Sequence, residues 1–137
     1  MEEFDIAIIG GGPAGIMAAI AASADLNVVL LEKNSSLGSK LLITGGGRCN
    51  ITNEKPIKKL LNSFHDKNFL KHSFYTFTNE MLLDLFRNRG LDFIVEDNNR
   101  VFPETEKSQD ILAILKYYLK DITIKYNYEV SDIKKED

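Results

Sequence analysis

Short apolar runs, separated by glycines and polar turns, organise the first quarter of the chain. The run Ile6–Ile9 is typical of a strand buried on both faces of a parallel sheet. Residues 14–24 are rich in Ala, Ile and Met around most of a helical circumference, which predicts a buried helix. A second apolar run, Val28–Leu31, predicts the next strand. The pattern therefore predicts a β-α-β unit over residues 4–33, with its two strands parallel.

Helix and strand patterns alternate in the middle of the chain. Thr78 or Asn79 can cap a helix whose apolar residues fall at helical spacing, and Gly90 can end that helix. Residues 93–95 and 100–103 predict two strands joined by a polar turn. We therefore expect an antiparallel hairpin to follow the helix.

A helix and returning strands are expected near the C-terminal end. Ser108 can cap a helix whose isoleucine and leucines recur at helical spacing. The alternation from Ile122 to Tyr126 predicts a strand, and residues 128–133 are expected to form another.

The expected organisation is the N-terminal part of one α/β domain. Its segments are a β-α-β unit at 4–33, a glycine-rich loop at 38–53, a helical and hairpin excursion at 54–107, and a helix with returning strands at 108–133. Three parallel strands are few for a doubly wound sheet, so we expect the remainder of the domain to lie beyond these residues.

Charge and composition narrow the classes of function. The net charge of −3, from 17 basic and 20 acidic residues, argues against general nucleic-acid binding, which favours a basic surface. No apolar run approaches the roughly 20 residues that span a bilayer, and the acidic N-terminus is unlike a secretory signal. The single cysteine, Cys49, excludes an internal disulfide. We therefore expect a cytoplasmic protein that binds neither nucleic acid nor membrane.

The segment Gly10–Gly15 fits the pattern G-x-G-x-x-G between the first predicted strand and the first predicted helix. Gly10 permits a tight turn, Gly12 removes a side chain where a pyrophosphate would approach, and Gly15 allows the helix to pack closely. The free N–H groups and the positive dipole end of the helix suit a doubly charged pyrophosphate. The motif in this context predicts a dinucleotide site, although it does not separate FAD from NAD.

An acidic residue, Glu32, ends the second predicted strand. A carboxylate at this position can accept hydrogen bonds from both hydroxyls of an adenosine ribose. It would repel a 2′-phosphate, so we expect this site not to hold NADP.

A second glycine-rich segment runs from Lys40 to Asn53. Its three consecutive glycines give a backbone that can lie against a flat ligand, and apolar residues at both ends are expected to hold the loop in place. Arg48 offers a fixed cation, and Asn50 offers both a donor and an acceptor. Because no carboxylate lies near Arg48 in the loop, we expect a ligand anion to pair with it, and an ion pair with a distant acid is the alternative.

Together these motifs resemble the bacterial BaiN/RdsA-type (aminoacetone-oxidase-like) NAD(P)/FAD-dependent oxidoreductases. The resemblance rests on Gly10–Gly15, Glu32-Lys33, Gly38–Lys40 and, most specifically, Thr44–Asn53, and it continues through Arg100–Pro103 and Lys107. The chain departs from the family pattern at three positions, Ser39, Thr105 and Ser108.

The resemblance implies FAD in a glutathione-reductase-like Rossmann domain, a parallel sheet with flanking helices. It implies that Lys40 lies near the AMP half, that Thr44–Asn50 runs beside the ribityl chain and the flavin, and that the backbone of Val130 contacts the adenine. It also implies an inserted second domain and a returning FAD-binding segment, both beyond these residues. The expected cofactor-binding residues are Gly10, Gly12, Pro13, Ala14, Gly15, Glu32, Lys33, Lys40, Thr44, Gly45, Gly46, Gly47, Arg48, Cys49, Asn50 and Val130.

Three functions remain open. The first is a flavoenzyme that passes electrons to a small organic acceptor or to oxygen, with NADH or NADPH as candidate donor. The second is an NAD-dependent dehydrogenase, which has no need of the second glycine-rich loop, and the third is a non-catalytic dinucleotide-binding module. We expect the first function of the full-length protein and no activity from these 137 residues alone.

The sequence assigns no catalytic residue and no metal site. Cys49 is expected to be a packed thiol, and His65 and His72 are expected to be solvated or core side chains.

Overall fold

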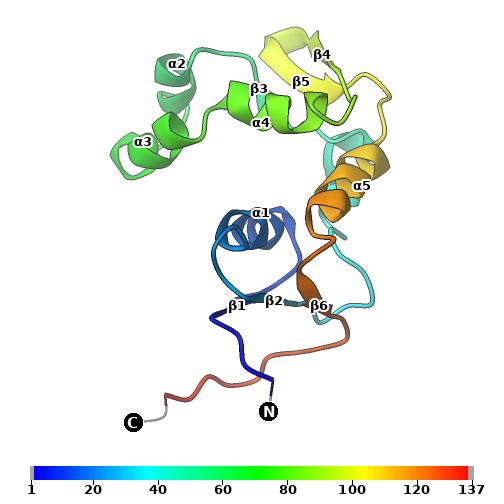
Figure 1. The fold of residues 1–137 in the computed structure, drawn as a ribbon. Coiled ribbons are helices and arrows are strands. Elements are labelled where there is room, and N and C mark those ends of the chain that lie inside the picture. Colours follow the sequence, from blue (N-terminus) through cyan, green and yellow to red (C-terminus); the bar gives the residue numbers. More distant parts are fainter. Residues whose placement is uncertain (1, 136–137) are drawn as a thin grey trace. The chain divides into compact units, whose positions relative to one another are not determined.

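The computed structural model describes residues 2–135, which form two compact units. One unit holds the residues up to Leu42 together with those from Leu112 onward, and the other holds Ile43–Ile111. The elements of both are drawn in Figure 1. The second unit is wider than the predicted excursion at 54–107, because it also contains the three consecutive glycines of the second motif.

The first unit is built on a parallel sheet of three strands in the order β1-β2-β6. They are β1 (Ile6–Ile9), β2 (Val28–Leu31) and β6 (Thr123–Lys125). Helix α1 (Pro13–Ala22) connects the first two, so the predicted β-α-β unit and the first returning strand are confirmed. The register pairs Ile6 with Val28 and Val29 with Thr123.

Helix α1 packs on one face of this sheet because its third residue is a glycine. A Cβ atom built on Gly15 would lie 1.9 Å from the carbonyl oxygen of Gly10 and 3.5 Å from Cγ2 of Ile8. No larger residue fits so close to the end of β1, which confirms the predicted packing role of Gly15.

Two burial predictions for this unit are wrong. In β1 the side chains alternate, and Ala7 and Ile9 are exposed while Ile6 and Ile8 are half-buried. Successive side chains of a strand point to opposite faces, and α1 covers only the face that carries Ile8. Helix α1 is likewise buried along one side, at Ile16 and Ala19, although its sequence is apolar almost all round.

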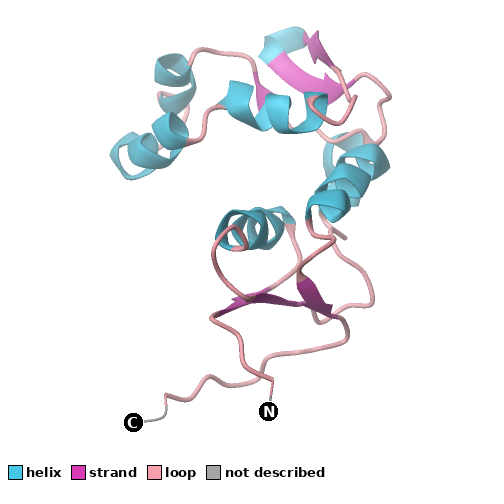
Figure 2. Cartoon of the chain, in the orientation of Figure 1, coloured by secondary structure: helices cyan, strands magenta, loops and turns pink. Residues whose placement is uncertain are grey.

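The second unit holds an antiparallel sheet in the order β3-β5-β4 and three helices. Its strands, shown in magenta in Figure 2, are β3 (Thr52–Asn53), β4 (Phe93–Glu96) and β5 (Arg100–Pro103). The helices are α2 (Ile57–Leu61), α3 (Lys67–Thr76) and α4 (Asn79–Arg87). The predicted hairpin is confirmed as β4 and β5, joined by a short 3-10 turn, η2 (Asp97–Asn99).

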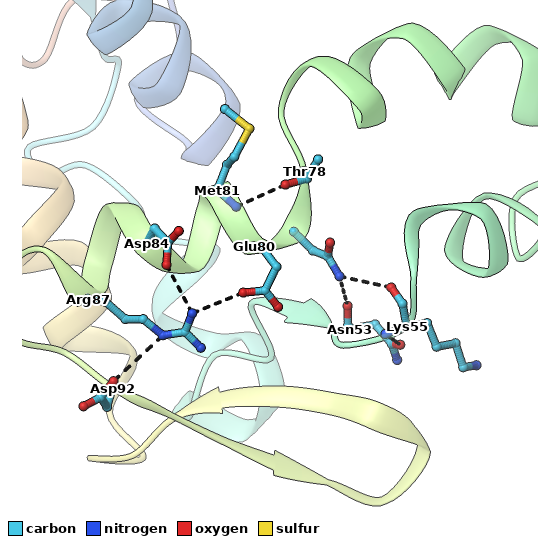
Figure 3. A network of polar contacts seen from close by, with 9 residues as sticks. Asn53, Lys55, Thr78, Glu80, Met81, Asp84, Arg87 and Asp92 are labelled. Carbon is cyan, nitrogen blue, oxygen red and sulfur yellow. Dashed lines mark hydrogen bonds and ion pairs between the residues drawn. The ribbon is translucent and has the colours of Figure 1, made fainter.

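Polar contacts fix both ends of α4, as Figure 3 shows. The hydroxyl of Thr78 accepts a hydrogen bond from the N–H of Met81, which confirms the predicted N-cap. Near the other end, Arg87 pairs with Glu80 and Asp84 at 3.2 Å. Gly90 follows the helix with φ of +82°, a conformation that favours glycine and ends the helix.

Two elements cross from one unit to the other. The kinked 3-10 segment η1 (Leu41–Gly47) lies in the loop predicted at 38–53, and α5 (Ser108–Tyr118) is the predicted C-terminal helix. Ser108, the predicted N-cap, is the first residue of α5 and is buried, so the helix begins one position earlier than predicted. Residues 128–133 form no strand, so that prediction is wrong.

Candidate functional site

A pocket of about 420 Å³ opens at the carboxyl ends of β1 and β2, within the first unit. Its walls come from the turn Gly10–Pro13, from Glu32–Asn34 after β2, from Gly38–Lys40, and from Tyr128–Val130 after β6. The carboxyl ends of parallel strands are where open α/β sheets bind ligands. Of the residues predicted to bind the cofactor, the structure brings Gly10, Gly12, Pro13, Glu32, Lys33, Lys40 and Val130 around one cavity, whereas Ala14 and Gly15 do not line it.

Gly10 and Gly12 shape the floor of this pocket in different ways. Gly10 has φ of +98°, which a residue with a side chain rarely adopts. Gly12 has an ordinary φ of −79°, and a Cβ built on it would meet no protein atom within 4 Å. The space beside Gly12 is therefore open to a ligand. Gly12 is also the N-cap of α1, where no side chain caps the helix and no acidic residue lies in the first turn.

Gly11, to which the sequence assigned no role, packs directly against Leu37 and Glu32. A Cβ on Gly11 would lie 2.3 Å from Cδ2 of Leu37 and 2.9 Å from Oε2 of Glu32. The N–H of Gly11 donates to that same Oε2 at 2.7 Å. This glycine therefore lets the turn close onto Glu32, and its position in the middle of the motif was the signal that could have identified it.

Glu32 directly follows β2, and its carboxylate is buried and ionised. Its Oε1 accepts hydrogen bonds from the backbone N–H of Asn34 at 2.8 Å and from the Asn34 side-chain amide at 2.7 Å. The bond from the Asn34 backbone, together with the bond from Gly11, holds the pKa of Glu32 below its ordinary 4.5, although burial acts in the opposite direction. A buried carboxylate held in this way is prepared to accept a hydroxyl donor.

The loop Thr44–Asn50 belongs to the second unit and forms a tight turn of its own. Gly45, Gly46 and Gly47 all have positive φ, between 56° and 88°, and Cys49 has φ of +62°. The N–H of Cys49 donates to the carbonyl of Thr44 at 3.0 Å and closes the turn. A Cβ on Gly45 would lie 2.9 Å from the backbone nitrogen of Asn50, so the turn is too tight for a larger residue there.

Two carboxylates from outside the glycine loop neutralise Arg48. The guanidinium pairs with Glu96 at the end of β4 and lies 2.9 Å from a carboxylate oxygen of Glu106. It also stacks over the ring of Phe102, with 4.2 Å between the guanidinium carbon and the ring centroid. The hydrogen bond to Glu96 raises the pKa of Arg48 above its ordinary value. The alternative, an ion pair with distant acids, is the one that the structure supports.

Cys49 and the histidines play no visible chemical role. Cys49 is 2% exposed, as predicted for a packed thiol, and burial raises the pKa of its thiol. His65 and His72 are both exposed. Among residues 2–135 no group of three or more His, Cys, Asp or Glu side chains could hold a metal ion, and no helix could cross a membrane.

Sequence comparisons identify the family of the chain and two of its relatives. The family model described as "HI0933-like protein Rossmann domain" matches residues 4–137. The 3-dehydro-bile acid delta(4,6)-reductase of Clostridium scindens is 34% identical over 123 residues, which cover 88% of this chain and 30% of the relative. The ribosomal RNA dihydrouridine synthase of Escherichia coli is 30% identical over 141 residues, which cover 100% of this chain and 34% of the relative.

Among solved structures, the THI4 protein of Thermovibrio ammonificans superposes with a TM-score of 0.51 at 17% identity, over 90% of this chain and 38% of that chain. This likeness bears on the fold alone, which is a Rossmann-like α/β fold with a parallel sheet. The chain spans about a third of the length of the two curated relatives.

Proposed function

Because the chain belongs to the HI0933-like protein Rossmann domain family of flavoprotein oxidoreductases, we propose that the complete protein is an FAD-dependent oxidoreductase. Electrons would come from a reduced donor, NADH or NADPH, and would pass to a small organic acceptor or to oxygen. The observation that carries this proposal is the pocket beside Gly12, where the open space and the ionised Glu32 meet at the ends of two parallel strands.

The residues around this pocket fit the AMP half of FAD. The pyrophosphate would lie against Gly12 and the uncapped N-terminus of α1, where free N–H groups and the helix dipole favour an anion. Glu32 would hold the ribose, and Tyr128–Val130 would flank the adenine. Lys33 and Lys40 line the same cavity and would lower the cost of bringing in two phosphate charges.

The residues of the second unit are proposed to serve the other half of the cofactor. By the family resemblance, the turn Thr44–Asn50 would run beside the ribityl chain and the flavin. A bound flavin supplies hydride chemistry, while the protein binds it, orients it and tunes its electronics. Arg48 is held by Glu96 and Glu106, so its proposed role is to keep the turn in shape rather than to neutralise a phosphate.

The test is to purify the complete protein, denature it and identify the molecule that is released. We expect FAD, bound without a covalent link. Release of NAD, or a failure to bind added FAD, would refute the proposal.

The variant Gly12→Val places a branched side chain in the open space beside the turn and should abolish FAD binding. Ala18→Val, on the exposed side of α1, is the matched control and should bind FAD normally.

A second candidate for the electron acceptor is a base in RNA. One surface of the second unit carries lysines and an exposed aromatic ring that could bind RNA. A cavity of about 350 Å³ between α2 and α3 is lined by Lys58, Lys67, Lys71 and Tyr75, and none of these lysines forms an ion pair with a described residue. Residues 57–77 contain four lysines and one aspartate, a local excess that the overall charge of −3 hides. Lysines beside an exposed aromatic ring are typical of surfaces that bind single-stranded nucleic acid.

The salt dependence of RNA binding separates this candidate from a small-molecule acceptor. If three lysines contact phosphates, the slope of log affinity against log salt should fall by about 2 units in the triple variant K58E/K67E/K71E. The control K116E/K120E/K134E changes the net charge equally and should leave the slope unchanged. Equal losses of RNA affinity in the two triple variants would refute the RNA candidate. Binding of anionic lipid vesicles in place of RNA would also refute it.

A further inference from the structure

The carboxylate of Glu32 has almost no free hydrogen-bonding capacity. Oε1 accepts from two donors, the backbone N–H of Asn34 at 2.8 Å and its side-chain amide at 2.7 Å. Oε2 accepts from one donor, the N–H of Gly11 at 2.7 Å. A carboxylate offers about four acceptor sites, so three are filled and the remaining one is on Oε2.

Backbone hydrogen bonds fix the main chain of Glu32 and Asn34, and three side-chain bonds oppose rotation of the carboxylate. The N–H of Glu32 donates to the carbonyl of Lys125 at 2.9 Å, and its own carbonyl accepts from the N–H of Tyr128 at 2.9 Å. The carbonyl of Asn34 accepts from the N–H of Asn127 at 3.1 Å. Both residues are therefore held by the segment that follows β6. Rotating the Glu32 side chain would break three charge-assisted hydrogen bonds at once.

We propose that Asn34 is a positioning residue for the ribose: it saturates Oε1 of Glu32, so that the carboxylate holds only one of the two ribose hydroxyls, through Oε2. This inference rests on the proposed function, because it needs an adenosine ribose in the pocket. It differs from the sequence-based expectation that Glu32 accepts both hydroxyls. The second hydroxyl then points to solvent, and its removal costs little affinity.

Two FAD analogues test this directly, one lacking the 2′-hydroxyl and the other lacking the 3′-hydroxyl of the adenosine ribose. The dissociation constant of each is measured on the flavin-free complete protein from the change in flavin fluorescence. In the natural protein we expect one analogue to bind about tenfold more weakly than FAD, since a hydrogen bond to a charged group is lost. The other analogue should bind within about twofold of FAD.

The variant Asn34→Ala removes the side-chain amide and keeps the backbone N–H, which frees one acceptor site on Oε1. In this variant both analogues should bind about tenfold more weakly than FAD, because both hydroxyls now have a partner. Ser36→Ala, an exposed position in the same loop, is the control and should keep the one-sided pattern of the natural protein. Asn34→Val repeats the test with a larger side chain that also has no donor.

Four results would overturn the inference. Equal losses for the two analogues in the natural protein would mean that Glu32 holds both hydroxyls, and no loss for either would mean that it holds neither. An unchanged one-sided pattern in both Asn34 variants would mean that another group restricts Glu32. A protein that binds neither FAD nor the analogues would overturn the proposed function, and this inference with it.

Discussion

Replacing Glu32 by glutamine separates the role of its charge from the role of its shape. A glutamine amide has one acceptor oxygen where the carboxylate has two, and its NH2 group cannot accept a bond. If the amide oxygen of the glutamine faces Asn34, its NH2 group faces the N–H of Gly11. In the natural protein the nitrogen of Gly11 lies 2.7 Å from Oε2 of Glu32, so the substitution leaves this N–H without an acceptor. A buried donor without a partner costs about 1–3 kcal/mol, so the Gly11 amide should exchange its hydrogen roughly 5- to 150-fold faster.

Hydrogen–deuterium exchange of the peptide that contains Gly11, in the flavin-free complete protein, measures this change. The matched control is Glu129→Gln, which removes the same charge from the wall of the same pocket. FAD affinity is measured in parallel and should fall in Glu32→Gln by about 1–3 kcal/mol, since a charged acceptor for the ribose is lost. Equal exchange rates and equal affinities in the two variants would refute the role assigned to the Glu32 carboxylate.

The lowered pKa of Glu32 predicts how the stability of the folded protein depends on pH. Hydrogen bonds from Asn34 and Gly11 hold the pKa of folded Glu32 below the ordinary 4.5. As the pH falls, the unfolded chain therefore takes up this proton first, and folding loses stability. The contribution is complete above about pH 4.5 and is lost as the pH falls through the lower pKa of the folded state. The difference in thermal stability between the natural protein and Glu32→Gln should be largest near neutral pH and should shrink in acid.

Three further predictions address the remaining site residues. Gly11→Ala places a Cβ 2.3 Å from buried Leu37 and should lower stability by about 1–3 kcal/mol, as measured by thermal unfolding; an unchanged midpoint would contradict the close packing. Arg48→Met removes the ion pairs with Glu96 and Glu106 and should speed amide exchange across the turn and the β4–β5 hairpin, whereas unchanged exchange would show that the pairs do not hold the turn. Cys49, at 2% exposure and with a raised thiol pKa, should react with a thiol reagent only after denaturation; rapid reaction of the native protein would contradict its burial.

The features that the sequence predicted correctly depend on neighbours along the chain. Gly15 lies only five residues after Gly10, so its packing role is visible in the spacing alone. Thr78 caps α4 by accepting from Met81, three residues later. Residues 128–133 illustrate the opposite case, because a strand needs a partner whose edge is free. The N–H of Tyr128 instead donates to the carbonyl of Glu32, and the segment becomes a wall of the pocket.

The features that the sequence missed depend on contacts between distant segments. Arg48 is neutralised by Glu96, which the β4–β5 hairpin carries to it, and by Glu106, which has φ of +55° in the turn after β5. Nothing within the glycine loop itself indicates either partner. Asn34 was overlooked for a different reason: a short polar residue after a strand is common, and only the measured distances show that it fills Oε1 of Glu32.

The glycines of the first motif can be divided into those that the chain requires and one that it does not. Gly15 and Gly11 are required by nearby protein atoms, and Gly10 is required by its positive φ. Gly12 meets neither condition, and as the N-cap of α1 it would stabilise the helix better as serine. A residue that is suboptimal for folding and faces open space indicates that atoms outside the chain occupy that space.

Gly12→Ser should therefore change two properties in opposite directions. The flavin-free protein should become more stable by roughly a few tenths of a kcal/mol, because the serine hydroxyl can accept a bond from the first turn of α1. FAD should bind more weakly, because the side chain enters the space that is proposed to hold the pyrophosphate. Thermal unfolding without flavin and titration with FAD measure the two effects separately. A variant that is more stable and also binds FAD as well as the natural protein would show that the open side of Gly12 is not where the cofactor approaches.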